Sequence, residues 1–575
     1  MMPDAQQPLS TLPRMLMLGI AFGQGIALFL LWRALANNVW PSQTPIINFP
    51  LWTLAIASPT LMLLCLNREN LPRSLKAVGA FSTVLAAAAL YVGWQASPWG
   101  EFPIGPLLTA YVITMLIAGF KGLMYCQLWI GRASLDYGAL FTHSWRNFLV
   151  AAFSALLTGG VAVILALWGN LFSAIGIGWF KALFESDWFL FPMLASAFGV
   201  GVLIFRQLVG VIDGVAKLLE GLMRLLLPLT ALVLVIFLGA LPFTGLQPLW
   251  ETGSGTALLL WLSAFMLFFV NAVYQTGDGS PYPPWVHRAL SAVLTLLPIV
   301  SALALYGLAL RINEYGWTVQ RCWAFTVLAL SALFAVGYAG CVIRWRQAWP
   351  SRLGRANTAL GGLVLAVMVL VNSPLFDFRA IALASQMQRV EAGEVELRDF
   401  DFSYARRHLA RPGHLRLQAL IAEHEASDPE LARIIKATER GQPSGQTFDE
   451  LWARLNYRPG PFEAPPGLRE AASATVFGRV SQRHTNPTLI RIDLDEDGDF
   501  EYVLLSQHRD NDNLVEAELF FREGDAWKNR ALVTSRATPD DVDVTASLRE
   551  GEIKRAEPQF KDLKLGELRF HQTFF

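Results

Sequence analysis

The sequence predicts a polytopic α-helical membrane protein of about eleven transmembrane helices, followed by a soluble C-terminal α+β domain that contains a β-rich module. Composition is the first reason. Of the 575 residues, 53% are hydrophobic and 16% are charged, whereas an ordinary soluble protein carries roughly 25% charged residues. The second reason is that apolar and charged residues are unevenly distributed along the chain. Long apolar segments recur through residues 1–374, and the chain after Leu375 is rich in Asp, Glu and Arg.

Eleven apolar segments approach the length needed to cross a bilayer. They lie at about 15–32, 49–66, 77–94, 104–120, 148–168, 189–205, 225–243, 256–273, 290–310, 323–342 and 358–373. We expect each of them to be a helix, because a backbone in lipid must satisfy its own hydrogen bonds. Two further segments, 133–146 and 206–222, mix apolar positions with charges. They predict helices that lie on the membrane surface.

The basic residues of the loops predict the orientation of these spans. If the N-terminus is cytoplasmic, fifteen Lys and Arg residues fall in the inside loops, and only Arg33, Lys181, Arg311 and Arg321 fall in the outside loops. This asymmetry is the one that the positive-inside rule describes. An odd number of spans then places the C-terminal domain outside the cytoplasm. A miscount by one span would break the alternation, so the bias also supports eleven.

Common enzyme and transporter signatures are missing from the sequence. No GxxxxGK[ST], HExxH or GxSxG pattern occurs. Ionisable residues, which ion-coupled transporters place within their spans, are essentially absent at mid-span. The closest approach to the paired acids of a lipid-linked sugar transferase is Glu185 with Asp187. We therefore assign no catalytic residue and favour a non-enzymatic protein. The net charge of zero averages two unlike regions and says nothing about nucleic-acid binding. No nucleic-acid partner is expected.

The chain after residue 374 divides into three predicted parts. Residues 375–440 predict an extracytoplasmic helical segment, residues 441–471 a Pro-rich linker, and residues 472–575 a β-rich module. The strand-like segments of this module lie at 474–480, 488–494, 501–506, 517–522, 530–535 and 565–575.

One acidic loop in this module predicts a calcium site. The sequence DLDEDGDFE places four acids at the first, third, fifth and ninth positions and a glycine at the sixth, where a sharp turn is needed. The predicted ligands are Asp493, Asp495, Asp497 and Glu501 through their side chains and Asp499 through its backbone carbonyl. Leu504 stands at the twelfth position and strands flank the loop, so it differs from an EF-hand. The alternative is a solvated acidic turn, but four acids so close would repel one another without a cation.

Two polar clusters at span ends are candidates for a ligand or interface site. Arg311, Glu314, Tyr315 and Arg321 share a short outside loop, where arginine is disfavoured. The arginines could pair with acids of the C-terminal domain or hold an anionic headgroup. The second cluster is Asn271, Gln275 and Asp278, at the inner end of a span. Helix capping and loop fixing are the simpler explanation for that cluster.

Three stretches carry a family resemblance. They are NAVYQTGDGSPYPPWVHRAL at 271–290, LYGLALRINEYGWTVQRCWA at 305–324, and SPLFDFRAIALASQMQRVEAGEVELRDFDFSYARRHLARPG at 373–413. In combination they resemble the bacterial family of domains of unknown function called DUF4153, and the similarity runs along most of the chain. The resemblance implies a bacterial inner-membrane protein of many spans. It implies no activity, because the family has no agreed one.

The favoured function is an envelope sensor, scaffold or partner-binding platform that presents a calcium-binding periplasmic domain. One alternative is a transporter or flippase of a lipid-linked or amphipathic substrate, in which Arg311 and Arg321 hold a headgroup. Another is a membrane-embedded transferase that uses Glu185 and Asp187. The expected partners are the lipid bilayer and an envelope protein or lipid-linked glycan.

Overall fold

The computed structural model describes residues 11–66, 71–247, 249, 255–274, 279–439, 448–475, 484–508, 511–524, 526–532, 563–565 and 568–570. The chain forms two compact units. The first, called the helical unit, comprises Met1–Phe400 and Tyr404–Leu415. The second, called the sheet unit, comprises Asp401–Ser403 and Arg416–Phe575.

Among the described residues of the helical unit, eleven helices are long and apolar enough to cross a membrane, which confirms the predicted number. They are α1 (Thr11–Ala36), α2 (Pro45–Cys65), α3 (Leu71–Gln95), α4 (Gly105–Ile130), α5 (Tyr137–Ala174), α7 (Asp187–Phe205), α8 (Val209–Thr244), α10 (Gly255–Val273), α11 (Pro284–Tyr315), α12 (Val319–Trp345) and α13 (Pro350–Leu370). A short helix, α6 (Trp179–Phe184), precedes α7. At most 44% of the residues in any spanning window are buried inside the protein. The apolar side chains that are not buried inside the protein are suited to contact with lipid. The chain is therefore a multi-pass α-helical membrane protein.

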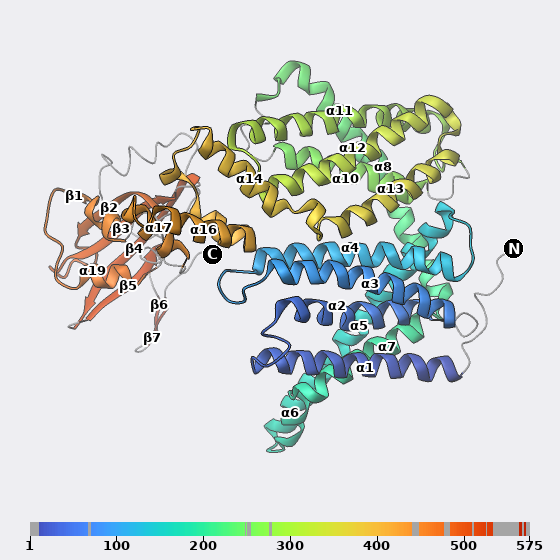
Figure 1. The fold of residues 1–575 in the computed structure, drawn as a ribbon, viewed down its shortest axis with the longest axis horizontal. Helices are drawn as coiled ribbons and strands as arrows, with labels where there is room; N and C mark the ends of the chain where they lie inside the picture. The colour runs from blue at the N-terminus through green and yellow to red at the C-terminus, as the bar shows by residue number, and fades with distance from the viewer. Residues whose placement is uncertain are drawn as a thin grey trace. The chain divides into compact units, whose positions relative to one another are not determined.

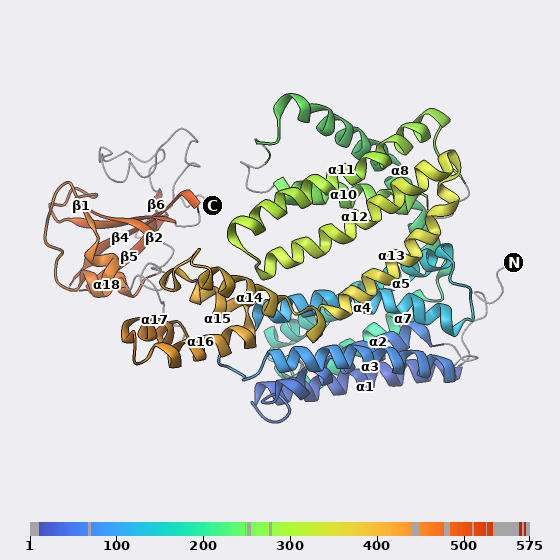
Figure 2. The same cartoon turned by 45° about the horizontal axis from the view of Figure 1, so that its top comes forward.

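The spanning helices pack around two apolar cores. One core joins α8, α10, α11 and α12, with fully buried side chains such as Leu294 and Tyr338. The other joins α1–α5 and α7, with Met17 and Leu85 at its centre. Helix α13 contributes Leu353 to the first core and Met368 to the second. In Figures 1 and 2, α13 accordingly lies between α12 and α4.

Glycines allow the closest helix contacts. A Cβ atom at Gly93 of α3 would lie 2.3 Å from the Pro45 carbonyl oxygen of α2, and one at Gly25 of α1 would lie 2.4 Å from Pro192 Cα of α7. Small residues at crossing points let two backbones touch, which maximises packing where lipid removes the hydrophobic driving force.

The two predicted surface helices are continuous with the spans that follow them. Residues 137–146 open α5, which has 38 residues, and residues 209–222 open α8, which has 36 residues. The expectation of separate helices is wrong because no glycine or proline separates either amphipathic stretch from the apolar run that follows it.

Residues 378–439 form four further helices, and the first of these pack within the helical unit. These helices are α14 (Phe378–Glu391), α15 (Phe402–His408), α16 (Ala410–His424) and α17 (Pro429–Glu439). Phe378 of α14 joins Cys322 and Val371 in a small core. Ala410 of α16 packs with Phe49 and Tyr111. The helical unit therefore extends past the last spanning helix.

The sheet unit contains a five-stranded sheet of order β1-β2-β3-β4-β5. Its strands are β1 (Asn456–Arg458), β2 (His484–Ile492), β3 (Glu501–His508), β4 (Asn511–Glu523) and β5 (Ala526–Leu532). Strand β1 pairs with β2 in parallel, and the other neighbours are antiparallel. A separate two-stranded sheet pairs β6 (Leu563–Leu565) with β7 (Leu568–Phe570). The first strand-like segment, 474–480, falls largely outside the described residues.

The segment predicted as a linker contributes to this unit. Its described part contains α18 (Phe448–Ala453), β1 and the first residues of α19 (Leu468–Ser473). Leu455 and Leu468 are buried in one core with Leu504 and Phe520 of the sheet. Residues 448–471 are therefore part of the folded module and not a linker. Their prolines separate short elements, and a local sequence window does not reveal the distant strands on which these elements pack.

Candidate functional site

The predicted metal loop is the turn that joins β2 to β3. Glu496 and Gly498 have φ angles of +62° and +91°, which lets the chain reverse within eight residues, 493–500. Carboxylates fix the turn by accepting backbone N–H groups. Leu494 N donates to Glu501 Oε2 at 2.6 Å, and Glu496 N donates to Asp493 Oδ1 at 2.7 Å.

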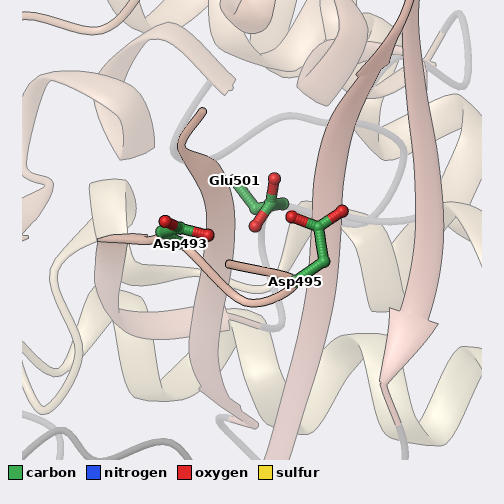
Figure 3. Close-up of side chains that lie close together, drawn as sticks. All are labelled: Asp493, Asp495 and Glu501. Carbon is green, nitrogen blue, oxygen red and sulfur yellow. The ribbon is translucent and has the colours of Figure 1, made fainter. Parts of the chain in front are cut away.

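The turn gathers three of the five predicted ligands. Carboxylate oxygens of Asp493, Asp495 and Glu501 lie within 4.8 Å of one another. Figure 3 shows the three side chains gathered at the turn. Two oxygens that each sit about 2.4 Å from one calcium ion can be at most about 4.8 Å apart, so the spacing suits a shared cation. Asp497 instead accepts the Asp499 N–H at 2.8 Å, and the side chains of both residues are exposed.

Glu501 is the electrostatically costly member of this group. Its side chain is buried, and this burial is the largest cause that raises its pKa. The charges of Asp495, Asp497 and Asp493 raise this pKa further, against the lowering effect of the Leu494 N–H bond. A bound cation would offset this repulsion, and carboxylate oxygens are the ligands that a hard cation prefers.

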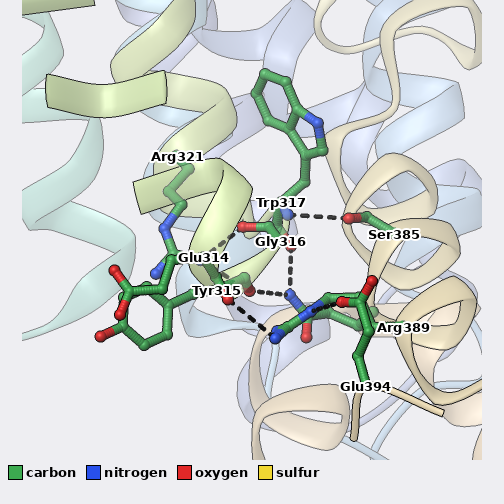
Figure 4. A network of polar contacts seen from close by, with 9 residues as sticks. Glu314, Tyr315, Gly316, Trp317, Arg321, Ser385, Arg389 and Glu394 are labelled. Carbon is green, nitrogen blue, oxygen red and sulfur yellow. Dashed lines mark hydrogen bonds and ion pairs between the residues drawn. The ribbon is translucent and has the colours of Figure 1, made fainter. Parts of the chain in front are cut away.

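The predicted cluster of Arg311, Glu314, Tyr315 and Arg321 lies at the end of α11 and the start of α12, and side chains of α14 bond to the loop between these helices (Figure 4). Gln386 Nε2 donates to the carbonyl oxygens of Tyr315 and Trp317, both at 2.9 Å. Arg389 donates to the Glu314 carbonyl at 3.0 Å, and Ser385 Oγ accepts the Trp317 N–H at 3.0 Å. The loop carbonyls that follow α11 are thereby paired with side chains of one other helix.

Arg321, in the first turn of α12, bonds to the backbone just before this helix. Its guanidinium donates to the Tyr315 and Gly316 carbonyls at 3.1 and 2.6 Å and lies 5.4 Å from the centre of the Tyr315 ring. Arg311, an exposed residue one helical turn before Tyr315, belongs to the same end of α11. Three of the four predicted residues, Glu314, Tyr315 and Arg321, thus meet in an arrangement that fixes the loop to α14.

Asn271 occupies the centre of a polar network between α5, α10, α12 and α13. Its Oδ1 accepts from the Tyr137 hydroxyl at 2.9 Å and from Asn357 Nδ2 at 2.6 Å. The Tyr338 hydroxyl lies 2.7 Å from Asn271 Oδ1 and 2.5 Å from Asn357 Oδ1. Pairing of this kind removes the cost of burying polar groups between helices. The other predicted members, Gln275 and Asp278, lie outside the described residues.

The two acids considered for a transferase are engaged separately. Asp187 accepts a hydrogen bond from Trp32 Nε1 at 3.0 Å. Glu185 pairs with Lys181 at 3.8 Å, one helical turn away, and both side chains are exposed. The contacts of these acids join α7 to α1 and close the turn after α6.

Sequence reasoning missed a second buried polar group, which centres on Asp377. This carboxylate accepts from the Tyr91 hydroxyl at 2.9 Å, from Gln95 Nε2 at 2.5 Å and from the Arg379 N–H at 3.0 Å. Its last contact caps the N-terminus of α14. A cavity of about 490 Å³ adjoins the group, lined in part by Trp94. The signal available was an Asp placed just before a helical run and after a proline, which is an N-cap pattern.

The family model described as "Domain of unknown function (DUF4153)" matches residues 51–419. The chain belongs to the DUF4153 family. No curated protein and no solved structure matches it. The DUF4153 match contains the loop after α11, the Asn271 network and the Asp377 group, and it ends within α16. The acidic turn lies beyond it, so family membership implies nothing about a metal there.

Proposed function

We propose that this DUF4153 protein is a non-enzymatic platform of the bacterial inner membrane that presents a calcium-binding module to a partner in the periplasm. The observation that carries the proposal is the acidic turn. Three carboxylates from positions 493, 495 and 501 converge at a separation that suits one cation, and one of them is buried among like charges. Free calcium is far more abundant outside cells than in the cytosol, so a weak calcium site is useful on that side.

The orientation is supported by the loops. The predominance of Lys and Arg in alternate loops favours a cytoplasmic N-terminus. With eleven spanning helices, the residues that follow α13 then lie in the periplasm. The proposed partner is an envelope protein or a lipid-linked glycan, because the spanning helices, as far as the structure describes them, present no mid-span charge of the kind that ion-coupled transport uses.

Topology is tested with fusions after Phe575. Alkaline phosphatase fused there is expected to be active, and green fluorescent protein fused there is expected to be dark, because each reporter matures on one side of the membrane only. The matched control places the same reporters after Trp345, at the opposite end of α12 from the loop that α14 holds. There the two signals should be exchanged. A fluorescent C-terminal fusion would overturn the periplasmic assignment.

Calcium binding is tested by thermal unfolding of the purified full-length protein in detergent. Calcium added after chelation is expected to raise the unfolding temperature of the sheet unit. The gain approaches about 2.7 kcal/mol when free calcium reaches about a hundred times Kd. In Asp495→Asn the gain should fall to near zero at the same calcium concentration, because one of the three converging carboxylates is lost.

The control is Glu496→Gln, which removes a charge from the same turn without touching the three converging carboxylates. It should keep most of the calcium effect. A wild-type protein that shows no calcium-dependent shift would remove the metal from the proposal. If Asp495→Asn shows the full calcium-dependent shift in unfolding temperature, calcium does not bind at this turn.

The platform function is tested in the native host by ending the chain after His424, at the end of α16. This truncation leaves the residues that pack within the helical unit and removes the sheet. It is expected to reproduce the envelope sensitivity of a strain without the gene. Full function of the truncated chain would favour a transport role of the helical unit instead.

A further inference from the structure

A cavity of about 410 Å³ opens between helices α4, α5, α10, α12 and α13. Aromatic rings make up most of its walls: Phe120, Phe141, Trp145, Phe148, Phe268 and Phe334. The rings of Phe148 and Phe268 are about half exposed, 53% and 49%, at the surface of the protein. Because all five helices are membrane-spanning, these exposed rings face lipid and the cavity communicates with the bilayer.

Lys121 is the single charged residue among the described residues that line this cavity. Among the residues that the structure describes, Lys121 makes no hydrogen bond or ion pair. The sequence predicts that the fourth span ends at residue 120, but α4 continues to Ile130 and carries Lys121 within the helix. Sixteen residues separate it from Gly105, which is about 24 Å at 1.5 Å per residue. Its ammonium therefore lies near one edge of a hydrocarbon core of about 30 Å.

The polar groups beside Lys121 do not neutralise it. Asn271, Asn357 and the Tyr137 hydroxyl line the same cavity, and they are bonded to one another as described above. Gly361 keeps space open on the other side. A Cβ atom at this position would lie 3.3 Å from the Tyr125 hydroxyl oxygen and 4.0 Å from Lys121 Nζ. The ammonium thus faces a lined space large enough for a ligand group.

We propose that this cavity binds an anionic phospholipid, with the phosphate against Lys121 and an acyl chain along the aromatic walls. A positive charge at the edge of the hydrocarbon core is costly without a partner, and a phosphate supplies one. Basic pockets between spanning helices on the cytoplasmic side are suited to anionic headgroups. In the proposed orientation this end of α4 is cytoplasmic. A lysine that only extends along a helix toward water would not need a cavity lined by rings from three other helices.

The test uses delipidated full-length protein in detergent and native mass spectrometry. Titration with dioleoyl phosphatidylglycerol is expected to show one preferred lipid, bound more tightly than dioleoyl phosphatidylethanolamine. Lys121→Met, which keeps the length of the side chain, should weaken phosphatidylglycerol binding by about fivefold or more. Lys121→Arg should retain it. The control is Lys76→Met, an exposed lysine near the start of α3. Equal binding to wild type and Lys121→Met, or an equal loss in Lys76→Met, would overturn the proposal.

A second measurement needs no variant. Wild-type protein in vesicles of phosphatidylethanolamine receives a trace of phosphatidylglycerol that carries a diazirine on its acyl chain. Covalent labels are expected to be enriched in peptides that contain Phe148, Phe268 and Phe334. Excess unlabelled phosphatidylglycerol should remove the enrichment. Labels spread evenly over exposed helices such as α1 and α8 would contradict a specific site.

Discussion

Asp377→Ala is expected to cost the helical unit about 3–5 kcal/mol, because it removes a helix cap and leaves buried donors without an acceptor. The Tyr91 hydroxyl and Gln95 Nε2 both donate to this carboxylate, and Gln95 is only 1% exposed. The fraction of monodisperse protein that survives a heating series, measured by size-exclusion chromatography, should fall at a temperature several degrees lower than in wild type.

Two variants define the cause of that loss. Asp377→Asn keeps an acceptor oxygen and should recover part of the stability. Glu391→Ala removes an exposed carboxylate from the same helix, α14, and should leave the melting temperature unchanged. If Asp377→Ala unfolds at the same temperature as wild type, the hydrogen bonds of Asp377 contribute little to stability, and α14 is held by its apolar contacts alone.

Gly316→Ala is expected to release α14 from the loop between α11 and α12. Gly316 has a φ of +71° and a ψ of −179°, a combination essentially restricted to glycine that costs an alanine about 1–3 kcal/mol. The added Cβ would also lie 2.9 Å from Gln386 Nε2 and 2.9 Å from Arg389 Cδ. These side chains can move only by giving up their bonds to the loop carbonyls. Hydrogen exchange of the amides of α14 should accelerate in the variant.

Gly393→Ala is the matched control, because Gly393 has a similar φ of +74° and no atom within 4 Å of an added Cβ. It carries a cost for a positive φ without the collision. Faster exchange confined to Gly316→Ala would assign the effect to the contact with α14. Equal acceleration in both variants would show that backbone strain alone is responsible.

The number of spans was predictable because each depends on a local property, the length of an apolar run. The ends of the spans were less predictable. The fourth span was expected to stop before Lys121, yet the helix continues because nothing in the following residues breaks it. A charge marks where lipid contact becomes costly, but only a change in backbone preference ends a helix. The sequence prediction therefore placed Lys121 in a loop, whereas the structure places it in the wall of a cavity.

The candidate sites divide in the same way. The acidic turn was predictable because its residues are adjacent in sequence, and the structure brings three of them together. Asp377 was not recognised as a site, because its partners Tyr91 and Gln95 are more than 280 positions away. Nothing in a local window distinguishes a helix cap that faces solvent from one that closes a buried network.

The spanning helices differ greatly in length, and this bears on the membrane that the protein fits. Helix α7 has 19 residues, which is about 29 Å, whereas α5 has 38 residues, about 57 Å. A long helix can tilt or project beyond the bilayer, but a short one must match its hydrocarbon thickness or thin it locally. Helix α7 therefore sets a preferred thickness near that of an ordinary bilayer, and a thicker, sterol-rich membrane would leave its ends mismatched.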